Sequence, residues 1–363
     1  MFQNICGDHQ TYCNLLDGNW VKPTSGDYIE IFSPVDGSLV GKVPAMSRED
    51  VDRAIANARE NLKNWAETPI YERASIFYRA ADLLESHAEE IAHILTMEIA
   101  KDKKSAVYEV QRTADFLRYT ADAGKGIAGE AINGDNFPGG SKTKVSYVSR
   151  VPLGTVLAIS PFNYPINLSV TKVAPALIGG NTVLLKPATQ GSISALYLAR
   201  VMQEAGLPRG VLNTITGLGS VIGDYVVTHP GVNFINFTGS TEVGKHISKL
   251  SAMVPLMLEL GGKDAAIVLP DADLDFAADN IVSGAYAYSG QRCTAVKRIL
   301  TQDSVADQLV PKLLSRIAKL QVGDPRDNAV IVPLINTKAA DFVMSLIDDA
   351  VAKVATVLTG GTR

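Results

Sequence analysis

The feature that most constrains the fold is a series of short apolar runs, rich in β-branched residues, between positions 150 and 260. The runs are Thr155 to Ile159, Thr182 to Leu185, Val211 to Ile215 and Val232 to Phe237. Each run after the first follows a helical segment, such as Ser192 to Ala205, which Gly206 and Pro208 close. Apolar strands that alternate with helices are typical of a parallel sheet covered on both faces and built with right-handed crossovers. We therefore expect an α/β fold whose ligands bind at the carboxyl ends of the strands.

The segments on either side of this series extend the α/β pattern. Behind Ser47, a helix cap, apolar positions recur at helical spacing through three segments to about Ala123, and Tyr28 to Val43 is typical of two strands joined by a turn. The alternating run Val145 to Val151 predicts a strand that could serve as an arm in assembly. Beyond residue 260 the pattern predicts strands at 265–269 and 297–301 and helices at 274–289 and 305–320. The end at 358–363 resembles a strand entering a glycine-rich turn, so we expect a truncated chain.

Composition narrows the class of partner. The length of 363 residues corresponds to about two domains at ~150 residues each. The 34 basic and 38 acidic residues are interspersed, so no basic stripe is available for nucleic acid. The sequence has no secretory signal and no run of ~18 apolar residues, which favours a cytoplasmic protein that does not bind membranes. Three cysteines and five histidines without ligand spacing suggest no metal site. A small molecule is the expected ligand.

Cys293 is the first candidate for chemistry. It lies in Tyr288-Ser-Gly-Gln-Arg-Cys-Thr, between a predicted helix and a predicted strand. Most free cysteines behave as small buried apolar residues, and this is the default interpretation of Cys293 when the thiol is considered alone. Arg292 favours a different one, because a fixed cation beside the sulfur stabilises the thiolate, which can attack a carbonyl carbon.

Glu259 is the second candidate, in the otherwise apolar run Met257-Leu-Glu-Leu-Gly-Gly-Lys263. A carboxylate between two leucines is paired, stands at the end of an element, or is desolvated, and a desolvated carboxylate suits a general base. The alternative is a salt bridge to Lys263, four residues away. The local sequence does not decide between these two interpretations.

Three loops at predicted strand ends carry further candidates. Ser160-Pro-Phe-Asn-Tyr-Pro165 presents Asn163, whose amide could donate to an oxyanion or satisfy its own turn. Phe237-Thr-Gly-Ser-Thr-Glu-Val-Gly244 joins a strand to a helix, and such a helix start can bind a pyrophosphate or simply be a cap. Lys186 ends another strand in Leu184-Leu-Lys-Pro-Ala-Thr-Gln190. Neighbouring strand ends would then supply phosphate and ribose contacts.

Taken together, these motifs resemble the aldehyde dehydrogenase superfamily in their order and rough spacing. The motifs are Ser160-Pro-Phe-Asn-Tyr-Pro, Lys186-Pro, Phe237-Thr-Gly-Ser, Glu259-Leu-Gly-Gly-Lys and Gly290-Gln-Arg-Cys-Thr. The resemblance implies a Rossmann-type cofactor-binding domain at 1–127 and 153–257, a bridging and oligomerisation arm at 128–152, and an incomplete α/β catalytic domain at 258–363. Within the superfamily, the chain is most similar to the non-phosphorylating, NADP-dependent glyceraldehyde-3-phosphate dehydrogenases. This similarity rests on the residues around Cys293, on Val110-Gln-Arg-Thr-Ala-Asp and on the Thr after Lys186-Pro-Ala.

The resemblance also implies a chemistry. Cys293 would attack the aldehyde carbon, and the amide of Asn163 with the backbone N–H of Cys293 would hold the oxyanion of the thiohemiacetal. After oxidation to a thioester, Glu259 would activate the hydrolytic water, so the product is an acid and no inorganic phosphate is consumed.

The cofactor implied is NADP rather than NAD. NAD enzymes of this superfamily often have a glutamate three residues after the motif lysine, where it repels a 2′-phosphate, and this chain has Thr189 there. The implied cofactor-binding residues are Ser160, Pro161, Lys186, Thr189, Gly219, Phe237, Thr238, Gly239, Ser240, Gly244 and Leu260.

A phosphorylated aldehyde as substrate requires cations and hydrogen-bond donors. The resemblance assigns these roles to Arg112, Tyr164, Arg292 and Thr294, although an arginine on a helix, such as Arg112, most often faces solvent. A homo-oligomer is implied, a tetramer built as a dimer of dimers. Two alternatives stay open at this point: another small aldehyde, such as a semialdehyde or lactaldehyde, as substrate, or a catalytically silent fragment that binds nucleotide.

Overall fold

A parallel β-sheet forms the centre of the molecule, and its strands arise from the apolar runs identified in the sequence. The computed structural model describes residues 1–127 and 129–362. The strand order is β11-β10-β9-β12-β13, and neighbouring strands run parallel. The bounds are β9 (Thr155–Ser160), β10 (Thr182–Pro187), β11 (Leu212–Thr214), β12 (Phe234–Thr238) and β13 (Leu256–Glu259). The predicted α/β fold is confirmed, and β13 is an additional edge strand that ends at Glu259.

The strand order reverses within this sheet. From β9 the chain crosses to β10 and then to β11 on one side, and it returns to the other side for β12 and β13. In open parallel sheets such a reversal leaves a crevice outside the carboxyl ends of the two central strands, here β9 and β12, and ligands bind in that crevice.

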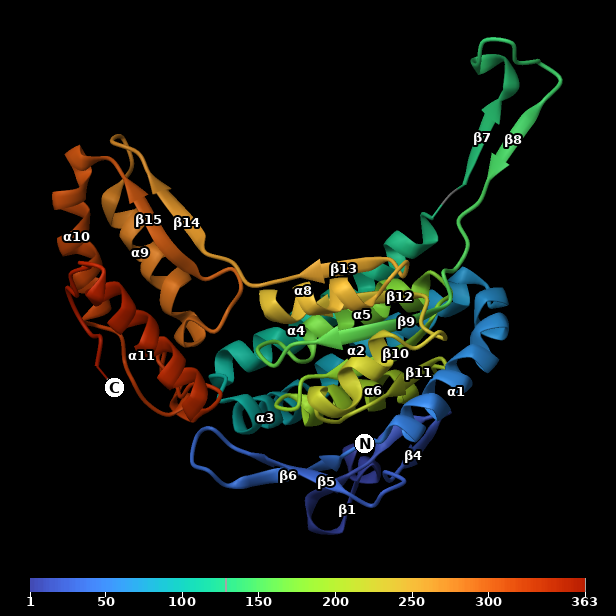
Figure 1. Cartoon of the computed structure of the whole chain (residues 1–363), viewed down its shortest axis with the longest axis horizontal. Coiled ribbons are helices and arrows are strands. Elements are labelled where there is room, and N and C mark those ends of the chain that lie inside the picture. Colours follow the sequence, from blue (N-terminus) through green and yellow to red (C-terminus); the bar gives the residue numbers. More distant parts are fainter. Residues whose placement is uncertain (128, 363) are drawn as a thin grey trace.

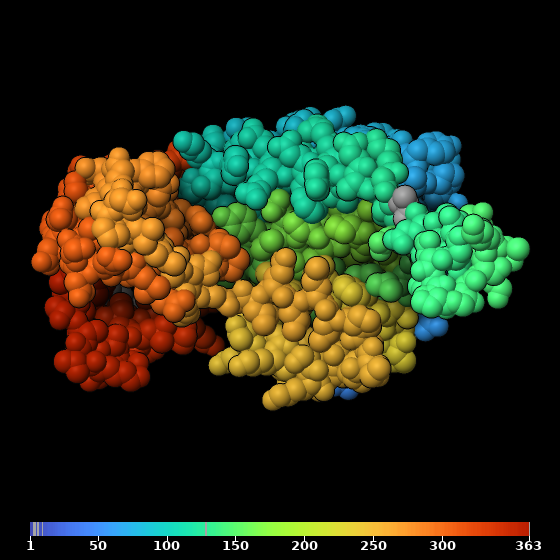
Figure 2. Space-filling model, turned by 90° about the horizontal axis from the view of Figure 1, so that it is seen from above, coloured from blue at the N-terminus to red at the C-terminus, as the bar shows by residue number. Residues whose placement is uncertain are grey.

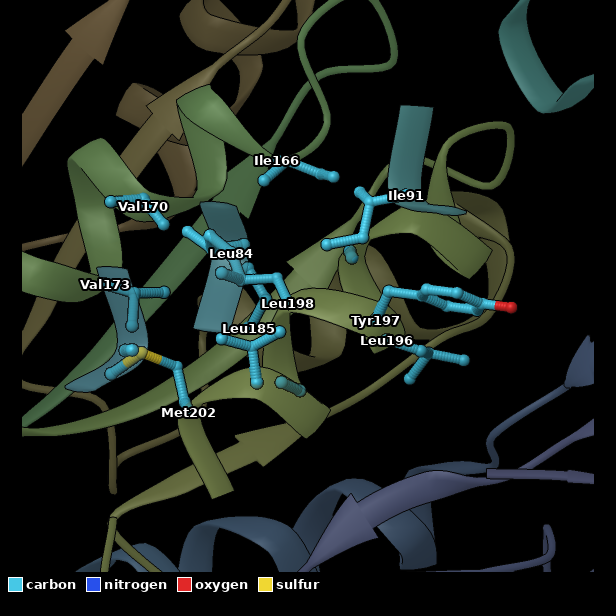
Figure 3. Packing of buried hydrophobic residues seen from close by; sticks show 14 of the residues in the cluster. Leu84, Ile91, Ile166, Val170, Val173, Leu185, Leu196, Tyr197, Leu198 and Met202 are labelled. Atoms are coloured by element: carbon cyan, nitrogen blue, oxygen red, sulfur yellow. The ribbon is translucent and has the colours of Figure 1, made fainter. Parts of the chain in front are cut away.

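Helices cover both faces of the sheet, because successive residues of each strand point to opposite sides. Val156, Ala158 and Leu185 join a core with α2 to α6, whereas Leu157 and Ile235 join a second core with α1, α7 and α8. Figure 3 shows the first core, where leucine and valine side chains from α2, α5, α6 and β10 converge. The helix bounds are α1 (Arg48–Glu67), α2 (Ile70–Ser86), α3 (Ala88–Ile99), α4 (Lys103–Lys125), α5 (Asn167–Ile178), α6 (Ser192–Glu204), α7 (Asp224–Val227) and α8 (Thr241–Leu250).

The helical first third begins at the predicted cap. The Ser47 hydroxyl accepts from the Asp50 N–H at 3.2 Å, and the Asp50 carboxylate accepts from the Ser47 N–H at 3.0 Å, which completes a capping box. Within the described residues 48–125 the chain forms four helices, so the expectation of three segments is wrong. Pro69 separates the first two helices, and Ala100, at a φ of 54°, ends α3 in the left-handed region.

The N-terminal strands lie against the helical layer. The predicted strand pair at 28–43 is confirmed as β5 and β6, which are antiparallel. The bounds are β1 (Cys6–Gly7), β2 (Thr11–Tyr12), β3 (Asn14–Leu16), β4 (Asn19–Val21), β5 (Tyr28–Phe32) and β6 (Leu39–Pro44). Short helical turns are η1 (Phe2–Ile5), η2 (Asp8–Gln10), η3 (Gly134–Asn136), the π-turn η4 (Gly219–Gly223), η5 (Ala287–Gly290) and η6 (Pro325–Asp327).

A C-terminal lobe and a hairpin stand at opposite ends of the molecule (Figure 1). The lobe contains β14 (Asp264–Val268), β15 (Val296–Thr301), α9 (Leu274–Tyr286), α10 (Asp303–Ile317) and α11 (Thr337–Ala352), with its own small core around Val268 and Leu309. The hairpin pairs β7 (Glu130–Asn133) with β8 (Val145–Val148). The strand expected before the terminal glycines is wrong, because the described residues 353–362 form neither helix nor strand. Residues 128 and 363 of the predicted arm and catalytic domain lie outside the described residues.

The helices of the described chain include none that is both long and apolar enough to pass through a bilayer.

Candidate active site

A cavity of about 1030 Å³ opens at the reversal point of the sheet. Figure 2 shows, from above, a groove with green residues at its bottom between the teal residues of α4 and the yellow residues around 240–260, but no residue of α4 lines the cavity itself. Predicted site residues that line the cavity are Ser160, Pro161, Asn163, Lys186, Phe237, Thr238, Gly239, Ser240, Leu260, Arg292 and Cys293. The structure therefore brings together side chains from three strand ends and from the turn that carries Cys293.

The turn before Cys293 has an unusual backbone. Tyr288, Ser289 and Gly290 have φ values of 54°, 53° and 73°, so three consecutive residues are left-handed, two of which are not glycine. Surrounding hydrogen bonds hold this conformation: the Tyr288 hydroxyl donates to the carbonyl of Ile99 at 2.6 Å, and the Ser289 hydroxyl donates to the carbonyl of Val332 at 2.7 Å. A strained backbone that is fixed from outside is often found at functional sites.

Cys293 is exposed to the cavity, and its thiol is free. The default interpretation of a free cysteine as a small buried residue therefore does not hold for Cys293. On the far side of the turn, the ammonium of Lys297 donates to the carbonyl oxygens of Arg292, Cys293 and Ala295 at 2.9–3.0 Å. Among the described residues the backbone N–H of Cys293 makes no hydrogen bond, so it stays available to a ligand oxygen.

Asn163 faces this turn directly. Its side-chain N–H donates to the carbonyl of Gln291 at 2.8 Å, and its side-chain oxygen is buried without a hydrogen-bond partner in the described part of the chain. Asn163 therefore does not satisfy its own loop, as the alternative interpretation required. The amide instead connects the loop after β9 to the segment that carries Cys293.

Glu259 ends β13 beside the cavity, although it does not line it. Its carboxylate accepts from the Thr238 hydroxyl at 2.9 Å and lies 3.7 Å from the ammonium of Lys172 on α5. The expected salt bridge to Lys263 is wrong, since the cation that faces Glu259 is Lys172. The expected desolvation is also wrong, because the Glu259 side chain is 55% exposed, whereas that of Lys172 is 1% exposed. Burial lowers the pKa of Lys172, and the nearby Glu259 carboxylate acts in the opposite direction.

Lys186, at the end of β10, is a buried cation. In the described part of the chain its ammonium has a single long hydrogen bond, to the carbonyl of Gly217 at 3.5 Å, and burial lowers its pKa to about 8. The side chain lines the cavity, so an anionic ligand there could restore the interactions that burial removes. Thr189, three residues on, is half-buried outside the cavity wall, and its carbonyl accepts from the Ser192 hydroxyl at 2.6 Å.

The amino end of α8 forms the opposite wall of the cavity. Ser240 caps this ten-residue helix by accepting from the Val243 N–H, and Gly239 lies against the ring of Phe237, so that a Cβ at Gly239 would come within 2.4 Å of it. A capped helix start with little side-chain cover is suited to a phosphate group. The remaining glycines differ: Gly244 makes room for Leu260, since a Cβ there would lie 2.5 Å from the leucine side chain, and Gly219 is exposed in η4.

Of the four predicted substrate residues, Arg292 lines the cavity, and Arg112, Tyr164 and Thr294 do not. Burial raises the pKa of the Tyr164 hydroxyl, and the positive charges of Arg292 and Arg112 act in the opposite direction. Arg112 on α4 and Thr294 are exposed.

Sequence reasoning missed some charged residues behind the site. Lys172 supplies the partner of Glu259, and Lys101 and Glu109 form a fully buried ion pair next to Tyr164. The available signal was a single charge within an apolar helical run, as at Lys172 in Asn167-Leu-Ser-Val-Thr-Lys-Val-Ala-Pro175.

Known proteins are similar to this chain over most of its length. The model of the aldehyde dehydrogenase family matches residues 20–363. NADP-dependent glyceraldehyde-3-phosphate dehydrogenase of Streptococcus equinus is 57% identical over 342 residues, which cover 94% of this chain and 71% of that protein. The enzyme of the same name from Pisum sativum is 48% identical, covering 96% of this chain and 71% of its own length. The crystal structure of NADP-dependent glyceraldehyde-3-phosphate dehydrogenase from Bacillus halodurans C-125 complexed with NADP superimposes with a TM-score of 0.95 at 51% identity, covering 97% of this chain and 74% of that one.

Proposed function

Because this chain belongs to the aldehyde dehydrogenase family, we propose that it oxidises glyceraldehyde 3-phosphate to 3-phosphoglycerate with NADP and without inorganic phosphate. The observation that carries the proposal is the exposed Cys293 thiol, which shares one cavity with Asn163, Arg292, Lys186 and the amino end of α8. A nucleophile, a donor for an oxyanion and two kinds of anion site therefore meet in one place.

The residues at the strand ends fit NADP. Lys186 is 7% exposed and has only a long contact to a carbonyl within the described residues, so an anionic group near its ammonium would compensate for its burial. Lys186 and the neutral Thr189 would hold the adenosine ribose and its 2′-phosphate, and Ser240 and Gly239 at the start of α8 would hold the pyrophosphate. Ser160, Pro161, Phe237, Thr238 and Leu260 would line the remaining wall, with Gly219 and Gly244 nearby. When bound, NADP accepts the hydride that the aldehyde loses.

The chain's own groups account for the covalent steps. The Cys293 thiolate attacks the aldehyde carbon and gives a thiohemiacetal, whose oxyanion lies where the free N–H of Cys293 and the amide of Asn163 can donate. Oxidation leaves an acyl group on the sulfur as a thioester. Glu259 then takes a proton from the attacking water, and Lys172, 3.7 Å away, stabilises the carboxylate in its charged form. The thiolate leaves as the acid forms.

Recognition of the substrate phosphate rests on the cations near Tyr164. Arg292 lines the cavity next to Cys293, and the charge of Arg112 on α4 acts together with that of Arg292 to lower the pKa of the Tyr164 hydroxyl against the effect of burial. Two guanidinium groups and a phenol are well suited to a phosphate, because guanidinium groups bind phosphate oxygens in pairs. Thr294, which follows the nucleophile, completes the proposed set.

The test is NADPH production from glyceraldehyde 3-phosphate by this chain in phosphate-free buffer. The unmodified chain should produce NADPH, and Cys293→Ser should not, while binding of NADP is retained. Activity that survives in Cys293→Ser, or that requires added phosphate, would refute the proposal.

A second candidate function is the oxidation of a different small aldehyde by the same chemistry. Alpha-ketoglutaric semialdehyde dehydrogenase of Bacillus subtilis is 37% identical over 99% of this chain and 74% of that enzyme, so a semialdehyde is a realistic competitor. Higher kcat/KM for a semialdehyde or lactaldehyde than for glyceraldehyde 3-phosphate would favour it. Tight binding of NADP without oxidation of any aldehyde would favour a silent nucleotide-binding chain.

We also propose the domain division 1–127 with 153–257 for cofactor binding, 128–152 as the arm, and 258–363 for catalysis. The separate small core of the C-terminal lobe supports the last boundary. The projecting hairpin exposes Tyr147 (82%) and Val151 (77%) beside it, which supports assembly into a homo-oligomer, a tetramer built as a dimer of dimers. The cytoplasmic location stays a prediction.

A further inference from the structure

Behind the proposed substrate site lies a buried ion pair that the mechanism above does not use. Lys101 follows α3 and Glu109 lies on α4, and both side chains are 0% exposed while their charged groups are in direct contact. Removing two charges from water costs several kcal/mol each, and apolar residues of the same size are often at least as stable. A pair of this kind is therefore poorly explained as a device for stability alone.

The Glu109 carboxylate connects α4 to the loop that carries Tyr164. One of its oxygens accepts from the backbone N–H groups of Ile166 and Asn167, both at 3.1 Å. These are the first amides of α5, which have no partner within their own helix. The carboxylate thus caps α5 from another element and fixes the chain two residues after Tyr164.

The Lys101 ammonium lies against two aromatic rings of the site. Its nitrogen is 3.5 Å from the centroid of the Tyr164 ring and 5.1 Å from the centroid of the Tyr288 ring. Tyr164 is one of the residues proposed for the substrate phosphate, and Tyr288 begins the left-handed turn that leads to Cys293. One cation therefore contacts the phenol proposed for the substrate phosphate and the segment that places the nucleophile.

We propose that Lys101 is a positioning residue, whose ammonium, held by Glu109, fixes the Tyr164 ring so that its hydroxyl can donate to the substrate phosphate. This inference rests on the proposed function. A cation against the face of a phenol ring also draws electron density from it, which makes the hydroxyl a better donor. Lys101 touches neither the substrate nor the cofactor in this arrangement and acts through Tyr164.

The experiment measures how glycerol 3-phosphate protects Cys293 against alkylation by iodoacetamide, followed by mass spectrometry of the Cys293 peptide, so no turnover is needed. Glycerol serves as the uncharged comparison. Lys101→Met should raise roughly tenfold the concentration of glycerol 3-phosphate that gives half-maximal protection, as expected for the loss of a desolvated cation–π contact. Tyr164→Phe should raise it similarly, and the double variant Lys101→Met/Tyr164→Phe should raise it no further than Tyr164→Phe alone. The control is Lys103→Met, which should have no effect. Lys103 lies two positions after Lys101, is exposed, and pairs with Glu89.

Each result decides a different point. The inference is overturned if the effects of Lys101→Met and Tyr164→Phe on protection by glycerol 3-phosphate multiply in the double variant, because the two residues would then act independently. It is also overturned if Lys101→Met leaves this protection unchanged. A merely structural role of Lys101 would lower the unfolding temperature without such coupling to Tyr164. If Lys101→Met does not fold, Lys101→Met/Glu109→Gln takes its place, since it leaves no unpaired charge and keeps an acceptor for α5. Absence of protection in the unmodified chain would overturn the phosphate assignment of the proposed function, and the inference with it.

Discussion

Replacement of Lys186 by methionine should stabilise the chain and weaken its hold on NADP. The side chain is buried at the end of β10, and burial lowers the pKa of its ammonium from 10.5 to about 8. At about 1.36 kcal/mol per pKa unit, this difference corresponds to a cost of about 3 kcal/mol in the ligand-free chain at neutral pH. Lys186→Met removes the charge at similar volume, so its free energy of unfolding at pH 7 should be higher by up to about 3 kcal/mol.

Titration of Lys186 makes the free energy of unfolding depend on pH. The folded-state pKa lies below that of the unfolded chain, so between pH 8 and pH 10.5 the unfolded chain binds more protons and stability rises with pH. The cost is present in full below pH 8 and disappears above pH 10.5. The difference between Lys186→Met and the unmodified chain should therefore shrink over that window, and taking the difference cancels other groups that titrate there. Urea unfolding at pH 7, 8, 9 and 10 measures it.

The same titration should appear in cofactor binding. As pH rises through 8 the Lys186 ammonium loses its proton, so the dissociation constant for NADP should increase in the unmodified chain. Lys186→Arg keeps its charge throughout and should show a flat profile, and Lys186→Met should bind weakly at every pH. A stability difference that does not vary with pH, or a pH-independent affinity in the unmodified chain, would refute the reasoning.

Three further substitutions test the role of Glu259, the binding of the substrate phosphate and the packing of the hydrophobic core. Glu259→Gln should slow hydrolysis about 100-fold or more while an early burst of NADPH persists, and mass spectrometry should find the acyl group on Cys293; its absence there would contradict the assignment. Arg112→Leu should raise KM for glyceraldehyde 3-phosphate about tenfold and leave KM for an uncharged aldehyde unchanged, as paired steady-state assays would show. Leu185→Ala, in the core of Figure 3, should cost about 2–5 kcal/mol of unfolding free energy in urea titrations; a cost below about 1 kcal/mol would contradict the packing.

The sequence predicted the parts of the site that local patterns determine. Ser160 and Thr238 directly follow apolar runs, and the carboxyl ends of such runs meet at one edge of a parallel sheet, so their placement followed from the strand pattern. The cap at Ser47 followed similarly from a motif of four residues.

Contacts between distant side chains could not be predicted in this way. Glu259 was given the wrong partner because Lys263 is close in sequence, whereas Lys172 reaches it only after α5 has packed on the sheet. Lys101 and Glu109 each resemble the solvent-facing charges of an ordinary helix, and only the approach of the loop at Tyr164 shows that they are buried. Buried pairs of this kind depend on tertiary packing, which periodicity does not encode.

The turn of Tyr288, Ser289 and Gly290 makes the reactive sulfur a product of the whole chain. Hydrogen bonds that hold this turn connect partners 189 and 128 positions apart in sequence, at Ile99 and Asn163. Contacts over such separations slow folding, because the entropy of closing the intervening loops must be lost before these contacts stabilise the chain. A copy in which these distant partners have not met would therefore carry the Cys293 thiol without the fixed turn and without the Asn163 amide beside it.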